Sequence, residues 1–207
     1  NRRVLYSGSN WSARQLDELL SMGRLELLAF GVHASHAVYE TPAGDTVRAE
    51  AVAQRMKDLR GTLCLAMACH AGLGVPDRGP DNQAELDFAQ AWLGRGANYI
   101  SSLGWAYGMH RHVGYQEELL ARTAAALLDG GGAAVGDALV AAKREYYLSH
   151  DMNPYHAKTL VGTGLYGLPM VRYSVAPAPN AAAAWEGVSQ PRTSRHDPTT
   201  PEAVPSV

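Results

Sequence analysis

The chain has 207 residues, of which 46% are hydrophobic and 18% charged, and its formal net charge at neutral pH is −2. This length and composition predict a globular chain with one good core, and they argue against disorder and against nucleic acid or an anionic membrane as the main partner. No run of residues approaches the roughly 18 uninterrupted apolar positions that a membrane-spanning helix requires.

Strands and helices are predicted to alternate along the first part of the chain. The patterns predict a strand at 4–7, a helix at 13–22, a strand at 25–32, a loop at 33–44, a helix at 46–59 and a strand at 62–68. The strands at 25–32 and 62–68 are nearly continuous apolar runs, which is typical of strands covered on both faces. The chain begins at Asn1 instead of a methionine, so we expect a processed or excised segment.

The alternation continues to about residue 175. We predict a Gly/Pro-rich loop at 71–80, a helix at 81–93, a strand at 97–103, a His-rich loop to 113, helices at 115–128, 135–148 and 154–161, and an edge-like strand at 170–175. Prolines and an alanine run after 176 indicate a linker or disordered tail. We therefore assign 1–175 to one α/β domain with a mostly parallel sheet, and 176–207 to the tail.

Three notable side chains stand where predicted parallel strands end: His33, Cys69 and Trp105. Ligands of such sheets bind at the carboxyl ends of the strands. The sequence therefore predicts a site there, with Cys69 as nucleophile. His33 is the best candidate for the base that takes the thiol proton and then stabilises the thiolate as an imidazolium.

The two cysteines are expected to differ in role. Cys64 and Cys69 are five residues apart on one predicted strand, so their side chains face opposite sides of the sheet. At roughly 16 Å apart they are too distant for a disulfide. Cys64 is expected to be a core residue and Cys69 the reactive one.

Other readings of the same residues remain open. His33, His36, Cys69 and His70 together form a candidate zinc set, although the adjacency of Cys69 and His70 makes shared coordination awkward, and we assign no metal. His70 is a second candidate base, ranked below His33 because a neighbouring side chain usually points away from the nucleophile.

Substrate contacts are predicted at three aromatic or imidazole side chains. Trp105 and Tyr107 are flanked by glycines and are expected to line a cleft together with His70. The loop acids Asp45, Asp77 and Asp81 could pair with a basic substrate side chain, but their ordinary interpretation is solvated surface.

These motifs resemble the catalytic domain of gingipain-type cysteine peptidases, in the caspase-like superfamily, over roughly residues 4–175. The histidine motif matches at 30–35 and the nucleophile motif at 68–72, and segments 96–108, 135–143 and 165–170 are similar in the same order. The resemblance implies a caspase-like three-layer α/β/α sandwich with a mostly parallel central sheet. It also implies a secreted or cell-surface location and no required cofactor, while a structural calcium site is not readable from the residues.

The resemblance further implies a cysteine endopeptidase with a His33/Cys69 dyad that cleaves peptide or protein substrates through an acyl-enzyme. The backbone N–H groups of Ala34 and Cys69 would form the oxyanion hole. Val32 and Ala34 stand where the family has glycines, which motivates the alternative of a weakened or inactive peptidase-like module with a binding, surface or secretion role. An acid that orients His33 is expected upstream of Asn1. The oligomeric state does not follow from the sequence.

Overall fold

The computed structural model describes most of the chain before the predicted tail. The described residues are 11–22, 25–55, 58–74, 86–109, 112–129 and 132–173. The predicted first strand at 4–7 and the tail at 176–207 lie outside them, so both stay predictions.

A four-stranded sheet forms the middle of the molecule, in the order β1-β5-β6-β7. Its strands are β1 (Leu27–Gly31), β5 (Leu63–Met67), β6 (Asn98–Ser102) and β7 (Thr163–Tyr166). β1, β5 and β6 are parallel and β7 is antiparallel to β6. Gly31 pairs with Met67, so β1 and β5 end level with one another.

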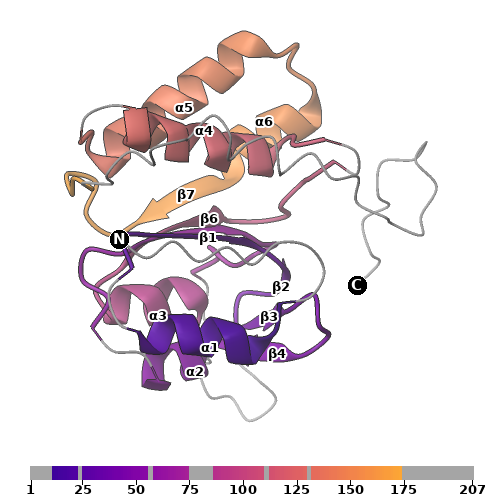
Figure 1. Cartoon of the computed structure of the whole chain (residues 1–207). Coiled ribbons are helices and arrows are strands. Elements are labelled where there is room, and N and C mark those ends of the chain that lie inside the picture. Colours follow the sequence, from indigo (N-terminus) through magenta and orange to yellow (C-terminus); the bar gives the residue numbers. More distant parts are fainter. Residues whose placement is uncertain are drawn as a thin grey trace.

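Helices cover both faces of this sheet (Figure 1). One layer contains α1 (Ala13–Ser21), α2 (Ala49–Arg55) and α3 (Phe88–Gly94), and the other contains α4 (Gln116–Asp129), α5 (Val135–Ser149) and α6 (Pro154–Gly162). The predicted three-layer sandwich with a mostly parallel sheet is therefore confirmed. None of the helices in the described residues is both long and apolar enough to cross a membrane.

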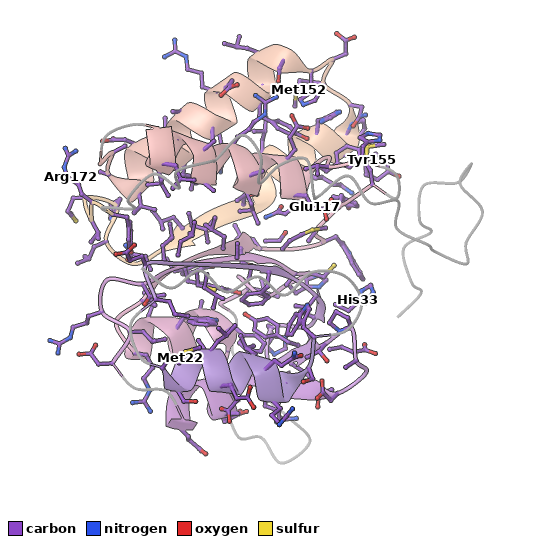
Figure 2. The ribbon with its side chains drawn as sticks, viewed as in Figure 1. Met22, His33, Glu117, Met152, Tyr155 and Arg172 are labelled. Carbon is purple, nitrogen blue, oxygen red and sulfur yellow. The ribbon has the colours of Figure 1, made fainter. Side chains whose placement is uncertain are left out.

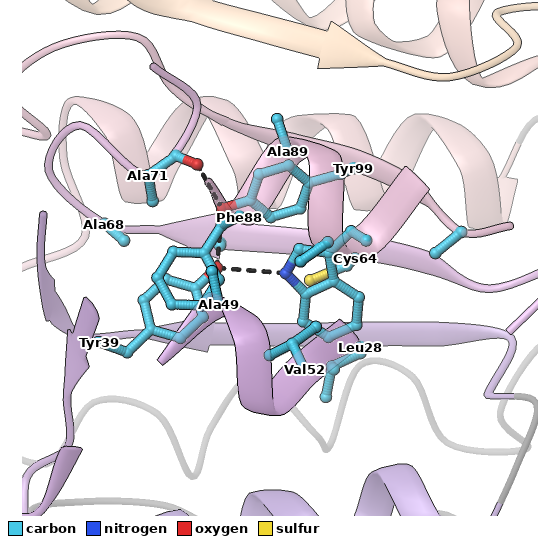
Figure 3. Packing of buried hydrophobic residues seen from close by; sticks show 14 of the residues in the cluster. Leu28, Tyr39, Ala49, Val52, Cys64, Ala68, Ala71, Phe88, Ala89 and Tyr99 are labelled. Atoms are coloured by element: carbon cyan, nitrogen blue, oxygen red, sulfur yellow. Dashed lines mark hydrogen bonds between the residues drawn. The ribbon is translucent and has the colours of Figure 1, made fainter. Parts of the chain in front are cut away.

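The side chains of β5 alternate between two separate cores. Cys64 and Ala66 belong to the core on the α1–α3 side, whereas Leu63 and Leu65 belong to the core on the α4–α5 side. All four are buried, as expected of a strand that is covered on both faces. Burial of each leucine contributes about 1.5–3 kcal/mol to folding. Figure 3 shows Cys64 among its apolar neighbours.

A second, three-stranded antiparallel sheet follows β1 and corrects two predictions. It contains β2 (His33–Ala34), β3 (Val38–Glu40) and β4 (Thr46–Arg48), in the order β2-β3-β4. The region 33–44 is therefore not a simple loop, and helix α2 begins at Ala49, not at Thr46. Strands of two or three residues are too short to show a period-2 pattern, and only tertiary pairing reveals them.

The starts of α1 and α3 are set by side-chain caps. Ser12 and Gln15 form a reciprocal capping box at α1. Asp87 accepts a hydrogen bond from the N–H of Gln90 (2.7 Å), so α3 begins at Phe88. The predicted helix start at Asp81 lies outside the described residues. The prediction that the helix includes 86–87 was wrong, because Asp87 has an extended backbone and caps the helix.

The strand predicted at 170–175 does not form over 170–173, and 174–175 lie outside the described residues. The strand that closes the sheet is β7, directly after α6, and Arg172 makes only an isolated bridge with Ala134. Gly167 (φ +116°) turns the chain away, and the side chain of Asn98 bonds both the N–H and the carbonyl of Leu168 (2.8 and 3.2 Å). The glycine within β7 weakens the strand pattern there, and this concealed it in the sequence.

Candidate active site

The predicted nucleophile lies in a tight turn directly after β5. Cys69 follows the strand by two residues, and His70 adopts the left-handed region (φ +56°), which histidine tolerates better than most residues. The N–H of His70 bonds the carbonyl of Gly104 (2.6 Å), and the N–H of Gly72 bonds that of Ser102 (2.8 Å). The turn is thus fastened to the end of β6.

The thiol of Cys69 faces the loop that follows β6. Its Sγ lies 3.4 Å from the backbone nitrogen of Ala106 and 3.8 Å from the carbonyl oxygen of the same residue. A protonated thiol can donate to that carbonyl, and an ionised sulfur can accept from that N–H. Cys69 is half-buried and Cys64 is fully buried, and neither forms a disulfide. Burial raises the pKa of the Cys64 thiol well above its ordinary value, which keeps Cys64 unreactive.

His33 lies at the same end of the central sheet. The N–H of Val32 bonds the carbonyl of Met67 (3.0 Å), which extends the β1–β5 pairing by one residue and leads directly into β2. The His33 side chain is exposed, and Figure 2 shows it at the edge of the sheet where β1 ends. The structure therefore brings the backbones of His33 and Cys69 to adjacent strand ends, as the sequence predicted.

The N–H of Ala34 is directed away from the neighbouring strand. Ser35 donates its N–H to the carbonyl of Val38 (2.9 Å), which makes that facing pair hydrogen-bonded. In an antiparallel ladder the next pair, Ala34 and Tyr39, is then non-hydrogen-bonded. The geometry therefore leaves the Ala34 donor outside the β2–β3 ladder.

The residues considered as a zinc set do not gather. Within the described ranges no three His, Cys, Asp or Glu side chains lie close enough to hold a metal ion. His36 is close enough to His70 for their charges to interact. Burial lowers the pKa of His70 below its ordinary value, and a charge on His36 lowers it further, so His70 stays neutral near pH 7.

The aromatic residues after β6 face two directions. Trp105 packs edge-to-face on His70, with ring centroids 4.7 Å apart. Tyr107 instead joins Tyr155 (5.1 Å) and Tyr115 (6.4 Å) beside α6. The predicted trio is therefore divided into a Trp105–His70 pair beside the nucleophile and a tyrosine cluster on the other layer. Nothing in the sequence pattern indicated Tyr115 or Tyr155.

The acids near the site differ from those considered in the sequence. The carboxylate of Asp45 accepts the N–H of Ala13 (2.9 and 3.1 Å) and bonds Thr41, and these hydrogen bonds hold its pKa below the ordinary value. Asp45 is therefore a cap of α1, and Asp77 and Asp81 lie outside the described residues. Glu117, which the sequence did not single out, lies at the strand-end edge, where a Cβ on Gly108 would stand 3.9 Å from its carboxyl carbon (Figure 2).

Comparisons with known proteins find similarity in structure alone. No protein-family profile matches the sequence, and no curated protein matches it. The structure of gingipain R, an Arg-specific cysteine proteinase, aligns with a TM-score of 0.55 and 13% identity over 79% of this chain and 36% of that chain. A second structure, described as a protease, gives a TM-score of 0.49 and 15% identity over 77% of this chain and 37% of its own. The likeness to gingipain R shows a shared fold. This chain spans about a third of the length of that proteinase.

Proposed function

We propose that this chain carries a cysteine endopeptidase site with Cys69 as nucleophile and His33 as its base. The carrying observation is the placement of a half-buried thiol and a histidine at the ends of two adjacent parallel strands, in a fold shared with a cysteine proteinase. A thiol held at that edge is accessible to a ligand that binds across the strand ends.

In the proposed reaction, His33 takes the Cys69 proton and the resulting thiolate attacks the scissile carbonyl carbon. The oxyanion accepts hydrogen bonds from the N–H groups of Ala34 and Cys69, and the direction of the Ala34 N–H supports this role. The imidazolium then protonates the leaving amine as the C–N bond breaks. Water, deprotonated by His33, hydrolyses the thioester and returns the thiol. These steps need no metal or cofactor, and the substrate is a peptide or protein.

The N–H of Ala106 supports the same chemistry at the sulfur. It lies 3.4 Å from Sγ and can stabilise a negative charge on the sulfur before the thiolate attacks the substrate. Val32, which replaces a glycine of the family pattern, is not strained, because among the described residues other than glycine only His70 and Tyr115 have positive φ. This favours the active enzyme over the weakened module.

The test uses peptides that carry a thiol-directed electrophile, with the labelled residue located by peptide mass mapping. We expect one label, on Cys69, and its loss in Cys69→Ala. Cys64→Ala is the matched control, because it removes the other cysteine and should leave labelling intact. Labelling that persists in Cys69→Ala overturns the assignment.

Measurement of turnover distinguishes the enzyme from the alternative, a peptidase-like binding module. A positional-scanning peptide library should contain substrates that the wild type hydrolyses and Cys69→Ala does not. A folded wild type that hydrolyses no member would favour the binding module. We also propose a secreted or cell-surface location, which fractionation of the native host would test.

A further inference from the structure

A row of buried hydrogen bonds lies directly behind the nucleophile turn. The Tyr99 hydroxyl donates to the carbonyl of Ala71 (3.1 Å), the Tyr39 and Tyr99 oxygens are 2.9 Å apart, and Trp92 Nε1 lies 3.3 Å from the Tyr39 oxygen. All three rings have no exposed surface. Figure 3 shows Tyr39, Tyr99 and Ala71 joined by these bonds. We call Trp92, Tyr39 and Tyr99 the relay.

The protons of the relay can be arranged in only one direction. Tyr99 uses its single proton on the Ala71 carbonyl, so its oxygen must accept from Tyr39. Tyr39 has then spent its own proton, and its oxygen accepts from the indole of Trp92, which can only donate. Burial raises the pKa of both phenols, so neither loses its proton in the working pH range.

Tyr39 and Tyr99 connect the relay to the segments that carry the two halves of the proposed site. Tyr39 lies in β3 directly opposite Ala34 of β2, the strand that begins with His33. Ala71 lies two residues after Cys69. The Tyr39 ring is fixed by stacking on Phe88, and α3 itself is joined to this sheet because the N–H of Phe88 bonds the carbonyl of His36 (3.0 Å).

A second phenol fastens the same turn from β7. The hydroxyl of Tyr166 donates to the carbonyl of Gly72, the residue after Ala71. Two successive carbonyls behind the nucleophile are therefore held by side chains of the central sheet. Of these two bonds, only the one from Tyr99 is linked onward, through Tyr39, to the sheet β2-β3-β4 that contains His33.

We propose that the relay positions the Cys69 turn relative to the His33 strand, and that Tyr39 and Tyr99 are positioning residues for the thiol reaction. The inference rests on the proposed function, because the two ends it joins are the proposed nucleophile and base. Without the Tyr99 hydroxyl, the Ala71 carbonyl loses its hydrogen-bond donor. Without the Tyr39 hydroxyl, the Tyr99 oxygen loses the donor that fixes it. In either variant we expect the turn to shift. Because reaction rates are sensitive to displacements of an ångström or less, the loss should appear in kcat.

The matched test compares Tyr99→Phe with Tyr173→Phe. Tyr173 is a buried tyrosine whose hydroxyl donates to the carbonyl of Thr62 (3.2 Å), at the opposite end of β5. Both variants lose a hydrogen bond from a buried phenol to a backbone carbonyl, but the two carbonyls flank opposite ends of β5. With the best library substrate, we expect Tyr99→Phe to lower kcat about tenfold with KM within about twofold. Tyr173→Phe should lose similar thermal stability and keep the wild-type kcat.

The relay further predicts that Tyr39→Phe resembles Tyr99→Phe, and that the double variant loses little more than either single one. Residues that act as one network show such non-additive losses. Wild-type kcat in Tyr99→Phe, an equal loss in Tyr173→Phe, or losses that multiply independently in the double variant would each overturn the relay.

A second readout separates this inference from the proposed function. The rate of Cys69 alkylation by iodoacetamide, followed by mass mapping, needs no substrate. We expect Tyr39→Phe and Tyr99→Phe to change that rate, together with its pH profile, by about threefold or more, and Tyr173→Phe to leave both unchanged. If the wild type hydrolyses no peptide, the proposed function fails while alkylation still decides the relay. If the wild type hydrolyses peptides and all variants alkylate alike, the relay fails and the proposed function stands.

Discussion

The close approach of Gly72 to β6 gives a sharp prediction about the nucleophile turn. A Cβ at this position would stand 3.0 Å from the carbonyl oxygen of Ser102 and 3.3 Å from that of Ser101. Both contacts are with backbone, which cannot rotate away as a long side chain can. In Gly72→Ala the turn must therefore move by a few tenths of an ångström, against the bond that its N–H makes to Ser102 (2.8 Å).

The expected cost follows from this overlap. Overpacking against a rigid neighbour costs about 1–3 kcal/mol of folding free energy, and we expect Gly72→Ala to fall within that range. Because the shifted turn also carries Cys69, we expect the labelling rate of the thiol to fall by more than the loss of folded protein explains. Urea unfolding gives the free energy, and electrophile labelling under native conditions gives the rate.

Gly74→Ala is the matched control for this prediction. Gly74 lies two residues further along the same segment, is exposed, has no positive φ and has open space where its Cβ would stand. It should be neutral or stabilising by up to about 1 kcal/mol, because alanine restricts the unfolded chain. Equal stability of Gly72→Ala and Gly74→Ala would refute the reasoning from close approach.

Two further predictions concern neighbouring residues. His70 has a folded-state pKa below its ordinary value of about 6.5, so the unfolded state binds more protons between the two pKa values. The stability that neutral His70 contributes is therefore full above about pH 6.5 and is lost as the pH falls from there through the lower folded-state pKa. His70→Asn keeps a residue that tolerates positive φ and should flatten the loss of stability between pH 7 and 5, measured by urea unfolding; parallel curves for the two proteins would contradict this. Cys64→Ala should cost about 1 kcal/mol through the small cavity left in the core, without changing the rate at which Cys69 is labelled; a slower rate would show that Cys64 takes part in the site.

Two strands of the central sheet, β1 and β5, were predictable because each lies in a long apolar run. The segments at 25–32 and 62–68 each contain a strand, and a continuous run of this kind survives an error of one or two residues at its ends. Burial from two sides is confirmed for β5 but was wrong for β1, which is an edge strand among the described residues and in which Ala29 and Gly31 are exposed. Once those strands are parallel, the placement of His33 and Cys69 at one edge follows from topology alone. This explains why the ends of the two strands were foreseen from local pattern.

What the sequence concealed depends on contacts between distant residues. Asp45 reads as a loop acid, but it caps a helix that begins 32 residues earlier. Tyr39 and Tyr99 are separated by 60 residues, and each alone is an ordinary core tyrosine. The strands β2, β3 and β4 have two or three residues each, so their pairing, and not their pattern, defines them. Such features become visible only when the chain is folded.

The two halves of the proposed site are held by different means, and this bears on how the site could be altered. The Cys69 turn is fastened by backbone bonds to Ser102 and Gly104 and by phenols from β6 and β7, all within the central sheet. The His33 strand belongs to the small antiparallel sheet, which adjoins the central one through Val32 and the relay. Changes in the small sheet that leave Tyr39 in place can therefore alter the base and the oxyanion donor while the nucleophile keeps its position. Val32 and Ala34 flank His33 and leave Tyr39 unchanged, so we expect their effect to appear in turnover, while labelling of Cys69 reports the nucleophile turn.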